Sequence, residues 1–360
     1  MTPRGAGQDT NISIWRLLRP FFIWLAAFYA VWLAIVVIGD HWTTLAHHWQ
    51  IAVAMAAGSY FAGSTPMGGG TVGFPILVLL LDEPARMGRD FSLAVQSIGM
   101  VSAAIFIFAA RRPIQLRVLG WAMLASLIVT PLSLAFIAPL IGDLTTKLIF
   151  AVTWCSFGIL TIYKIREMIA MTGITPTSGR FDRDMGLAIG VIGGVAASMT
   201  GVGIDMVLYA VLALLYRADL KISVPTSVAA MAFTSVVGVT SQWMMGRMDP
   251  AVFGHWLAAA PIVAIGAPFG AIVVQYIPRA PTLLIVASLC VGQFVWTMLR
   301  EGITGTALIA AFGGVLVCNL FFHILYNQGS KLQSQTNGIE DSAPTYATEN
   351  RMHDLPDAVS

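Results

Sequence analysis

Two stretches interrupt long apolar runs with glycine and small polar residues: GSTPMGGGTVGFPILVLLL at residues 63–81 and SMTGVGIDMVLYAVLALLY at residues 198–216. Glycine and proline leave backbone N–H and C=O groups without helical partners, and in hydrocarbon these groups need partners. Broken helices of this kind persist where they face protein or a water-filled cavity. A matched pair in the two halves of one chain therefore indicates the substrate site of a membrane transporter.

The composition places the chain in a membrane. Of its 360 residues 57% are hydrophobic and 11% are charged, with a mean hydropathy of +0.78, whereas a soluble domain averages about 25% charged residues. The three cysteines, Cys155, Cys290 and Cys318, lie in apolar runs and are interpreted as buried hydrophobic residues. We expect no metal site and no cofactor.

Apolar segments recur along the chain and predict an all-α integral membrane protein. Two of them, 51–81 and 186–216, contain the breaks and are too long for one straight crossing; they begin 135 residues apart. The other eight have the length of a single membrane helix: 20–39, 91–110, 118–141, 146–169, 224–245, 252–276, 281–299 and 304–326.

The similarity between the two halves continues beyond the breaks. Each broken segment is followed by a short polar link, a helix that ends near a basic residue, and a helix that begins near a tryptophan. These tryptophans, Trp121 and Trp256, are again 135 residues apart. The pattern predicts an internal repeat of four elements, in which one broken segment precedes three membrane helices.

The basic residues distinguish two placements of the broken segments. If each broken segment crosses the membrane once, 11 of the 20 Lys and Arg residues lie on the side of the N-terminus; if each re-enters and returns, 15 of the 20 lie there. Cytoplasmic loops are enriched in Lys and Arg, so the re-entrant placement is favoured. Each repeat then crosses three times, which gives the two repeats opposite orientations, an arrangement common in alternating-access transporters.

The predicted organisation places both termini in the cytoplasm and the repeats between two additional helices. The polar C-terminal tail holds few large apolar residues and is expected to be disordered. The predicted segments are a cytoplasmic tail (1–19), an N-terminal membrane helix and loop (20–50), repeat 1 (51–171), a cytoplasmic linker (172–185), repeat 2 (186–300), a C-terminal membrane helix (301–327) and a disordered cytoplasmic tail (328–360).

These motifs resemble the sulfite exporter TauE/SafE family, a group of bacterial anion permeases. The resemblance covers roughly residues 50–300, and in the second break Val202 and Asp205 stand where the family more often has a denser glycine run. It implies export or uptake of small sulfur-containing or organic anions. The matching motifs are GGGTVGFP at 68–75, FSLA at 91–94, Arg111-Arg112, Gly193-Gly194, 201–203 and PTS at 225–227.

The predicted anion site rests on backbone and hydroxyl donors. No Lys or Arg lies near the centre of an apolar span, so we expect the N–H groups and dipole at the start of a half-helix to attract the anion. The alternative is that the small polar residues only let helices pack closely. The predicted substrate-binding residues are Ser64, Thr65, Gly68, Gly69, Gly70, Thr71, Gln96, Ser97, Thr200, Gly201, Gly203, Thr226 and Ser227.

Asp205 is the one acidic residue well inside an apolar stretch. Carboxylates within the membrane are costly and usually functional, which makes Asp205 a candidate proton carrier that couples proton and anion movement. The other interpretation is a residue that caps the second half-helix.

The leading functional hypothesis is a secondary transporter of a small anion such as sulfite, an organosulfonate or a carboxylate, which works by alternating access in a bacterial inner membrane. The alternative is an anion channel with re-entrant pore helices. The chain lacks a G-x-x-x-x-G-K-[ST] motif and any nucleophile–base pair in its spans, which argues against an ATP-driven pump and an enzyme. The expected partners are the anion and the lipid bilayer, with no nucleic acid. The sequence leaves open which anion is moved, in which direction, with which coupling ion and in which oligomeric state.

Overall fold

The computed structural model describes residues 14–65, 70–273, 276 and 279–342. This part of the chain is helical throughout and has no strand. Its α-helices are α1 (Ile14–Leu17), α2 (Arg19–Ile38), α3 (Trp42–His47), α4 (Trp49–Ser64), α5 (Gly70–Pro75), α6 (Ala85–Ala109), α7 (Leu116–Phe136), α8 (Asp143–Ala170), α9 (Gly179–Thr200), α10 (Ile204–Ala210), α11 (Leu220–Met244), α12 (Val252–Val273), α13 (Arg279–Arg300) and α14 (Gly305–Ser342). Short π-helices follow α5 (Ile76–Leu80) and α10 (Val211–Leu215), and a 3-10 turn (Ala138–Leu140) follows α7.

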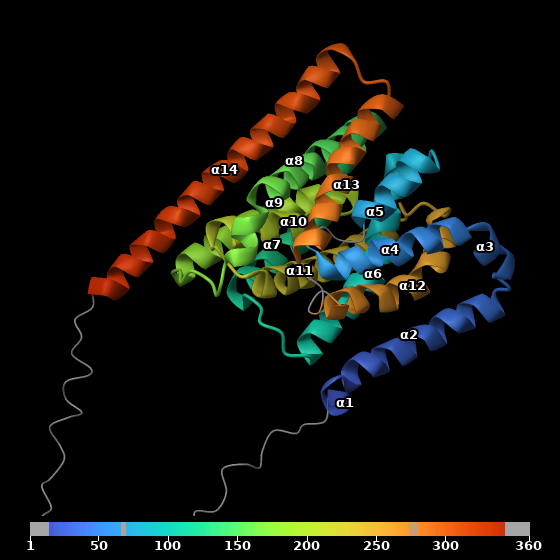
Figure 1. The fold of residues 1–360 in the computed structure, drawn as a ribbon. Helices are drawn as coiled ribbons and strands as arrows, with labels where there is room; N and C mark the ends of the chain where they lie inside the picture. Colours follow the sequence, from blue (N-terminus) through green and yellow to red (C-terminus); the bar gives the residue numbers. More distant parts are fainter. Residues whose placement is uncertain (1–13, 66–69, 274–275, 277–278, 343–360) are drawn as a thin grey trace, which may run out of the picture.

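Eight of the described helices are long and apolar enough to cross a membrane: α2, α6, α7, α8, α11, α12, α13 and α14. Helix α6 is the most enclosed of them, whereas α2 and α14 lie at opposite edges of the bundle with most of their surface exposed (Figure 1). Large apolar side chains cover this outer surface, as hydrocarbon requires. The chain is thus an all-α, multi-pass membrane protein, as the composition predicted.

The second broken segment turns back to where it began. The backbone N–H of Thr175, just before α9, donates to the carbonyl of Tyr216 at 3.0 Å, and the N–H of Asp219 donates to the carbonyl of Gly173 at 2.7 Å. The reversal lies between α9 and α10, where Gly201 has φ +81° and Gly203 has φ +134°. Residues that carry a side chain rarely adopt these backbone φ angles, so the turn depends on both glycines.

The first broken segment also folds back on itself. A Cβ atom placed on Gly58 of α4 would lie 3.1 Å from Cβ of Val72 in α5, and one placed on Gly73 would lie 3.2 Å from Sδ of Met55. Helix α5 therefore runs back along α4, and Figure 1 shows the two side by side. Residues 66–69 of the glycine motif lie outside the described residues.

The two halves match at a constant separation of 135 positions. The π-helices Ile76–Leu80 and Val211–Leu215 are related in this way, and so are both ends of α6 and α11. Residues with positive φ follow the same rule: Asp82 corresponds to Arg217, and Arg111 to Gly246. The separation seen in the tryptophans thus extends to turn geometry.

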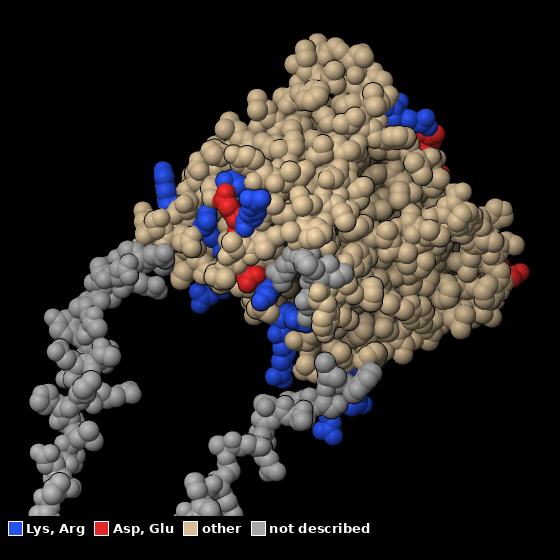
Figure 2. Space-filling model, in the orientation of Figure 1, with Lys and Arg blue, Asp and Glu red and all other residues tan. Residues whose placement is uncertain are grey.

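The charged side chains gather at two opposite ends of the bundle. Figure 1 shows α1 and the end of α14 on one side, here called the terminal face, and the loop between α13 and α14 on the other, the opposite face. In Figure 2 most Lys and Arg side chains lie toward the terminal face, while a smaller group mixed with acidic residues lies toward the opposite face.

The expectation of disorder from residue 328 onward needs correction, because α14 continues to Ser342. The reason is tertiary packing. Gly329 lies so close to the π-helix after α10 that an added Cβ would stand 2.1 Å from the Leu214 carbonyl oxygen, and the Tyr326 hydroxyl donates to Glu167 of α8. Residues 343–360 lie outside the described part of the chain.

Candidate anion-binding cavities

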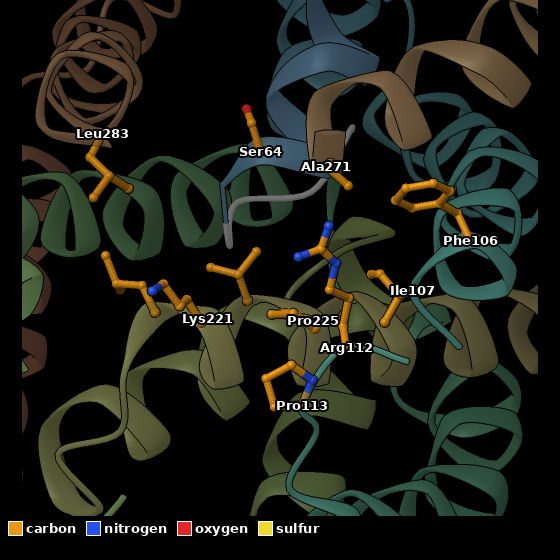
Figure 3. Close-up of a pocket in the computed structure, with 12 residues that line it drawn as sticks. Ser64, Phe106, Ile107, Arg112, Pro113, Lys221, Pro225, Ala271 and Leu283 are labelled. Carbon is orange, nitrogen blue, oxygen red and sulfur yellow. The ribbon is translucent and has the colours of Figure 1, made fainter. Parts of the chain in front are cut away.

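A cavity of about 120 Å³ opens at the terminal face, below the end of α4. Arg112 and Lys221 contribute its cationic groups, and in Figure 3 the guanidinium of Arg112 points toward the end of α4 and Ala271. The lining residues are Gly63, Ser64, Phe106, Ile107, Arg112, Pro113, Leu220, Lys221, Val224, Pro225, Ala271 and Leu283. This cavity therefore joins the tip of the first broken segment to a basic rim.

A second cavity, of about 450 Å³, opens at the opposite face and reaches Met199 in the last turn of α9. Arg86, Arg89 and Arg247 supply three guanidinium groups. The lining residues are Pro84, Arg86, Arg89, Leu134, Ala138, Pro139, Ile141, Asp143, Thr146, Met199, Gln242 and Arg247. The tip of the second broken segment is thus also joined to a basic rim.

The two cavities share five corresponding positions. These lining residues pair at the 135-residue separation as Ser64 with Met199, Ile107 with Gln242, Arg112 with Arg247, Lys221 with Arg86, and Val224 with Arg89. Each cavity therefore has one break from one half of the chain and a corresponding pair of basic residues, one from each half, to which Arg89 is added at the opposite face.

The opposite-face cavity adds a buried ion pair. Arg89 Nη2 and Nε each lie 2.7 Å from Oδ1 of Asp90, and Gln242 Nε2 donates to the same oxygen at 2.7 Å. Arg89 is 8% exposed and Asp90 is fully buried. The other oxygen of Asp90, Oδ2, is buried without a hydrogen-bond partner among the described residues.

The predicted residues of the first break divide between cavity and helix. Ser64 lines the terminal-face cavity, and its buried hydroxyl has no hydrogen-bond partner among the described residues. The Thr65 hydroxyl donates to the carbonyl of Phe61 at 2.7 Å. Gly70 begins α5 and Thr71 follows it. Gly68 and Gly69 lie outside the described residues, and so does the side chain of Thr71.

Gln96 joins α6 to the second break. Its Nε2 donates to the carbonyls of Gly201 and Ser92, at 2.9 and 3.0 Å, while Oε1 is buried without a partner in the described part of the chain. Ser97 donates to the carbonyl of Ala94 at 2.8 Å. The amide of Gln96 thus satisfies a backbone group that the break leaves free.

The second break is closed by its own hydrogen bonds. The Thr200 hydroxyl lies 2.8 Å from the Val202 carbonyl, and Oδ1 of Asp205 accepts from the N–H groups of Gly203 and Met206 at 3.1 and 3.0 Å. Asp205 is fully buried, and its Oδ2 has no partner among the described residues. The contacts of Oδ1 are those of a helix-capping carboxylate.

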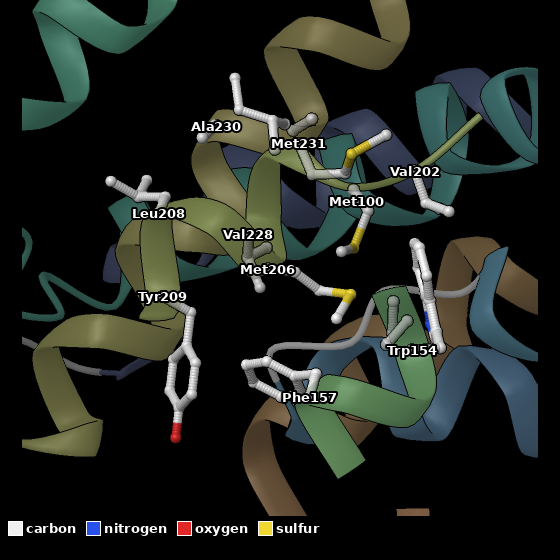
Figure 4. Packing of buried hydrophobic residues seen from close by; sticks show 14 of the residues in the cluster. Met100, Trp154, Phe157, Val202, Met206, Leu208, Tyr209, Val228, Ala230 and Met231 are labelled. Atoms are coloured by element: carbon white, nitrogen blue, oxygen red, sulfur yellow. The ribbon is translucent and has the colours of Figure 1, made fainter. Parts of the chain in front are cut away.

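Apolar side chains surround the tip of this break. Figure 4 shows Val202 and Met206 beside Met100 of α6 and Trp154 and Phe157 of α8. All five side chains are buried. In this conformation a packed apolar layer therefore covers one side of the α9–α10 turn.

Thr226 and Ser227 lie one turn into α11, directly after the cavity-lining Pro225. The Thr226 hydroxyl donates to the Ile222 carbonyl at 2.6 Å and accepts from the N–H of Gln115 at 3.1 Å. Ser227 donates to the carbonyl of Val224 at 2.9 Å. Both hydroxyls stabilise the wall of the terminal-face cavity.

The sequence model of the sulfite exporter TauE/SafE family matches residues 49–297, which include both breaks and the walls of both cavities. The chain belongs to this family. TauE/SafE proteins are membrane transporters of sulfite or related anions and are not enzymes. A search of curated proteins and a search of solved structures each returned no match.

The basic residues of the cavities in this TauE/SafE protein were not predicted from its sequence. No buried cationic side chain was expected near an anion, whereas Arg89 is buried in the cavity wall. The reason is that Arg89 lies in the first turns of α6, just before the apolar segment that begins at residue 91. A signal was present, because Arg112 with Arg247, and Arg86 with Lys221, keep a basic residue at corresponding positions of the repeat.

Proposed function

We propose that the protein is a secondary transporter that moves a small oxyanion, such as sulfite, an organosulfonate or a carboxylate, by alternating access. The observation that carries this proposal is the pair of cavities. They open at opposite faces, end at different breaks and are lined by corresponding residues. Conformations that exchange the shapes of two corresponding cavities would expose one central site to each side in turn.

The proposal includes an inverted repeat. Each half consists of a re-entrant broken helix pair and three membrane helices, with α2 and α14 added at the ends. The backbone bonds between Gly173 and Asp219 support re-entry of the second pair from the terminal face, and α5 packing along α4 supports re-entry of the first. Two hairpins that re-enter from opposite faces meet near the membrane centre.

In the proposed recognition, the anion first contacts the basic rim of a cavity and then the break at its inner end. Guanidinium groups bind oxyanions through two parallel hydrogen bonds, which suits Arg112 and Arg247 to attract sulfite, sulfonates and carboxylates alike. At the terminal-face break the Ser64 hydroxyl, which has no partner in the described part of the chain, and the N–H groups at the start of α5 follow the rim. The predicted residues of the second break, Thr200 and Gly201, would join them after the conformational change.

The proposed orientation has the terminal face in the cytoplasm of a bacterial cell, with the protein in the inner membrane. The gathering of Lys and Arg toward this face supports it, because cytoplasmic loops carry the excess of basic residues. Proton coupling through a buried carboxylate is also part of the proposal, and Asp205 is the candidate that the sequence alone predicts.

Flux into proteoliposomes tests this proposal. We expect saturable uptake of radiolabelled sulfite, a sulfonate or a carboxylate, and faster uptake when unlabelled anion is inside, since a carrier returns faster when loaded. Losing a charge-assisted hydrogen bond costs about 1.5–3 kcal/mol, so Arg112→Gln should raise KM about 10- to 100-fold. The matched control is Arg180→Gln, at an exposed position in the first turn of α9 outside both cavities.

A flux that does not saturate and does not respond to internal anion would support the channel instead. The apolar layer around Met206 and Trp154 favours the transporter, because it fills one side of the α9–α10 turn with buried side chains, where a pore would need water.

A further inference from the structure

The opposite-face cavity breaks the correspondence between the halves at one place. Arg89, Asp90 and Gln242 form a buried charged cluster there, whereas the corresponding residues at the terminal face are apolar: Val224, Pro225 and Ile107. A transporter that needed only two equivalent cavities would not need this charged cluster in one of them.

The cluster is unevenly bonded. All three donor contacts, two from Arg89 and one from Gln242, converge on Oδ1 of Asp90, and Oδ2 has none among the described residues. An arginine fork usually engages both oxygens of a carboxylate. The Asp90 carboxylate therefore contacts its donors through Oδ1 alone, and Oδ2 is a buried position that could take a proton.

Arg89 is the link between this carboxylate and the cavity. Its side chain lines the cavity wall while it contacts Asp90, which lies behind it in α6. Its backbone also touches the second break, because a Cβ placed on Gly201 would lie 2.5 Å from the Arg89 carbonyl oxygen. A conformational change at the second break would therefore act directly on Arg89.

Among the charged groups around this cavity, the Arg89–Asp90 pair is the one in which an anion could replace the carboxylate. Asp143, the carboxylate among the lining residues, accepts from the N–H of Ala85 and lies 3.0 Å from Lys147. Helix α9 contributes the uncharged Met199. At the ends of these elements toward the opposite face, the charged and titratable groups around Asp90 include Arg86 and Arg89 of α6, Arg247 after α11, Asp143 and Lys147 of α8, His255 of α12 and Glu83 in the link before α6.

We propose that a substrate oxyanion takes the place of Asp90 on Arg89, and that Asp90, once released, accepts a proton at Oδ2. This inference rests on the proposed transport function and assigns its coupling. A buried carboxylate without a cation is strongly disfavoured, so departure of Arg89 drives protonation. The proton comes from the solution that fills the cavity. When Arg89 pairs with Asp90 again on the other side, anion and proton both leave, so one proton accompanies each bound anion.

Asp90 fits this role better than Asp205. Asp205 has no cationic partner among the described residues and is held by two backbone N–H groups, whereas Asp90 contacts the cavity-lining Arg89. An anion that arrives at either cavity would not displace any partner of Asp205. Asp90 loses its partner as a direct consequence of anion binding.

The test uses the full chain in proteoliposomes with sulfite as probe. A pH gradient should drive sulfite accumulation in the unaltered protein, and an internal pH dye should report proton entry with each anion. Asp90→Asn should abolish gradient-driven accumulation while it keeps anion exchange, and should lower the KM of exchange because Arg89 has lost its competitor. Arg89→Lys, which keeps the charge without the fork, should raise KM about tenfold and retain coupling. Asp184→Asn, in an exposed pair with Arg183, is the matched control.

Net sulfite uptake by the unaltered protein without proton entry would overturn this inference and leave the transport function standing. So would gradient-driven accumulation by Asp90→Asn equal to that of the unaltered protein. Absence of saturable flux in the unaltered protein would instead reject the proposed function itself. The proton measurement on the unaltered chain needs no variant, so the inference stays testable even if Asp90→Asn fails to fold.

Discussion

Gly201→Ala should destabilise the protein through the turn of the second break. Gly201 has φ +81°, where a side chain costs about 1–2 kcal/mol. The added Cβ would also stand 2.5 Å from the Arg89 carbonyl oxygen and 2.7 Å from Cβ of Ser92. Ordinary contacts are longer, and overpacking of this kind costs typically about 1–3 kcal/mol. The two effects together predict a loss of about 2–5 kcal/mol.

Thermal unfolding of the purified protein in one detergent and at one scan rate measures this loss, because unfolding of such proteins is scan-rate dependent. At roughly 2 °C per kcal/mol for a long chain, Tm should fall by roughly 4–10 °C. The matched control is Gly120→Ala in α7, at an exposed position where an added Cβ meets nothing within 4 Å. Alanine is the better helix former, so this variant should keep or raise Tm. A Gly201→Ala protein with the Tm of Gly120→Ala would refute the reasoning about the turn.

Three further substitutions probe the contacts around the breaks and α14. Gln96→Leu leaves the Gly201 carbonyl without its donor and should cost about 1–3 kcal/mol, read as a lower Tm; an unchanged Tm would mean that the carbonyl finds another partner. Asp205→Asn keeps an oxygen for its two backbone donors, so the pH profile of transport should stay as in the unaltered protein; a flat profile would return the proton to Asp205. Tyr326→Phe removes a hydrogen bond to the Glu167 carboxylate and should speed proteolysis within the last turns of α14; unchanged cleavage would show that packing alone holds this helix.

Helix positions were largely predictable because hydrocarbon imposes length and apolarity on a crossing segment. The start of α6 shows where that criterion fails. The apolar segment begins at residue 91, yet the helix begins at Ala85, after Pro84. A proline at the N-cap leaves the following residues free to be helical, and Asp143 accepts from the Ala85 N–H. The charged residues before residue 91 set the start of the predicted apolar segment, whereas backbone hydrogen bonding starts helix α6 at Ala85.

The breaks were predictable as breaks, but their closure was not. Glycines mark a place where helical bonding stops, yet only the folded chain shows which group replaces the missing partner. The carbonyl of Gly201 is satisfied by Gln96, 105 positions earlier. Likewise Asp90 meets Gln242 across 152 positions. Contacts at such separations depend on the packing of α6 against α11 and α9, which no local pattern encodes.

The corresponding residues of the repeat and the unmatched cluster at Asp90 have different roles in the proposed mechanism. Corresponding residues such as Arg112 and Arg247 give the two faces similar basic rims, and similar rims by themselves bind an anion equally well from either side. Coupling to a second ion requires a group whose charge changes when the anion binds. A symmetric pair of such groups would take up two protons for one site. In the proposed coupling, a single carboxylate, Asp90, with the apolar Pro225 at its counterpart, would give one proton for each anion. The departure from the repeat is therefore the part of the structure from which the proposed stoichiometry follows.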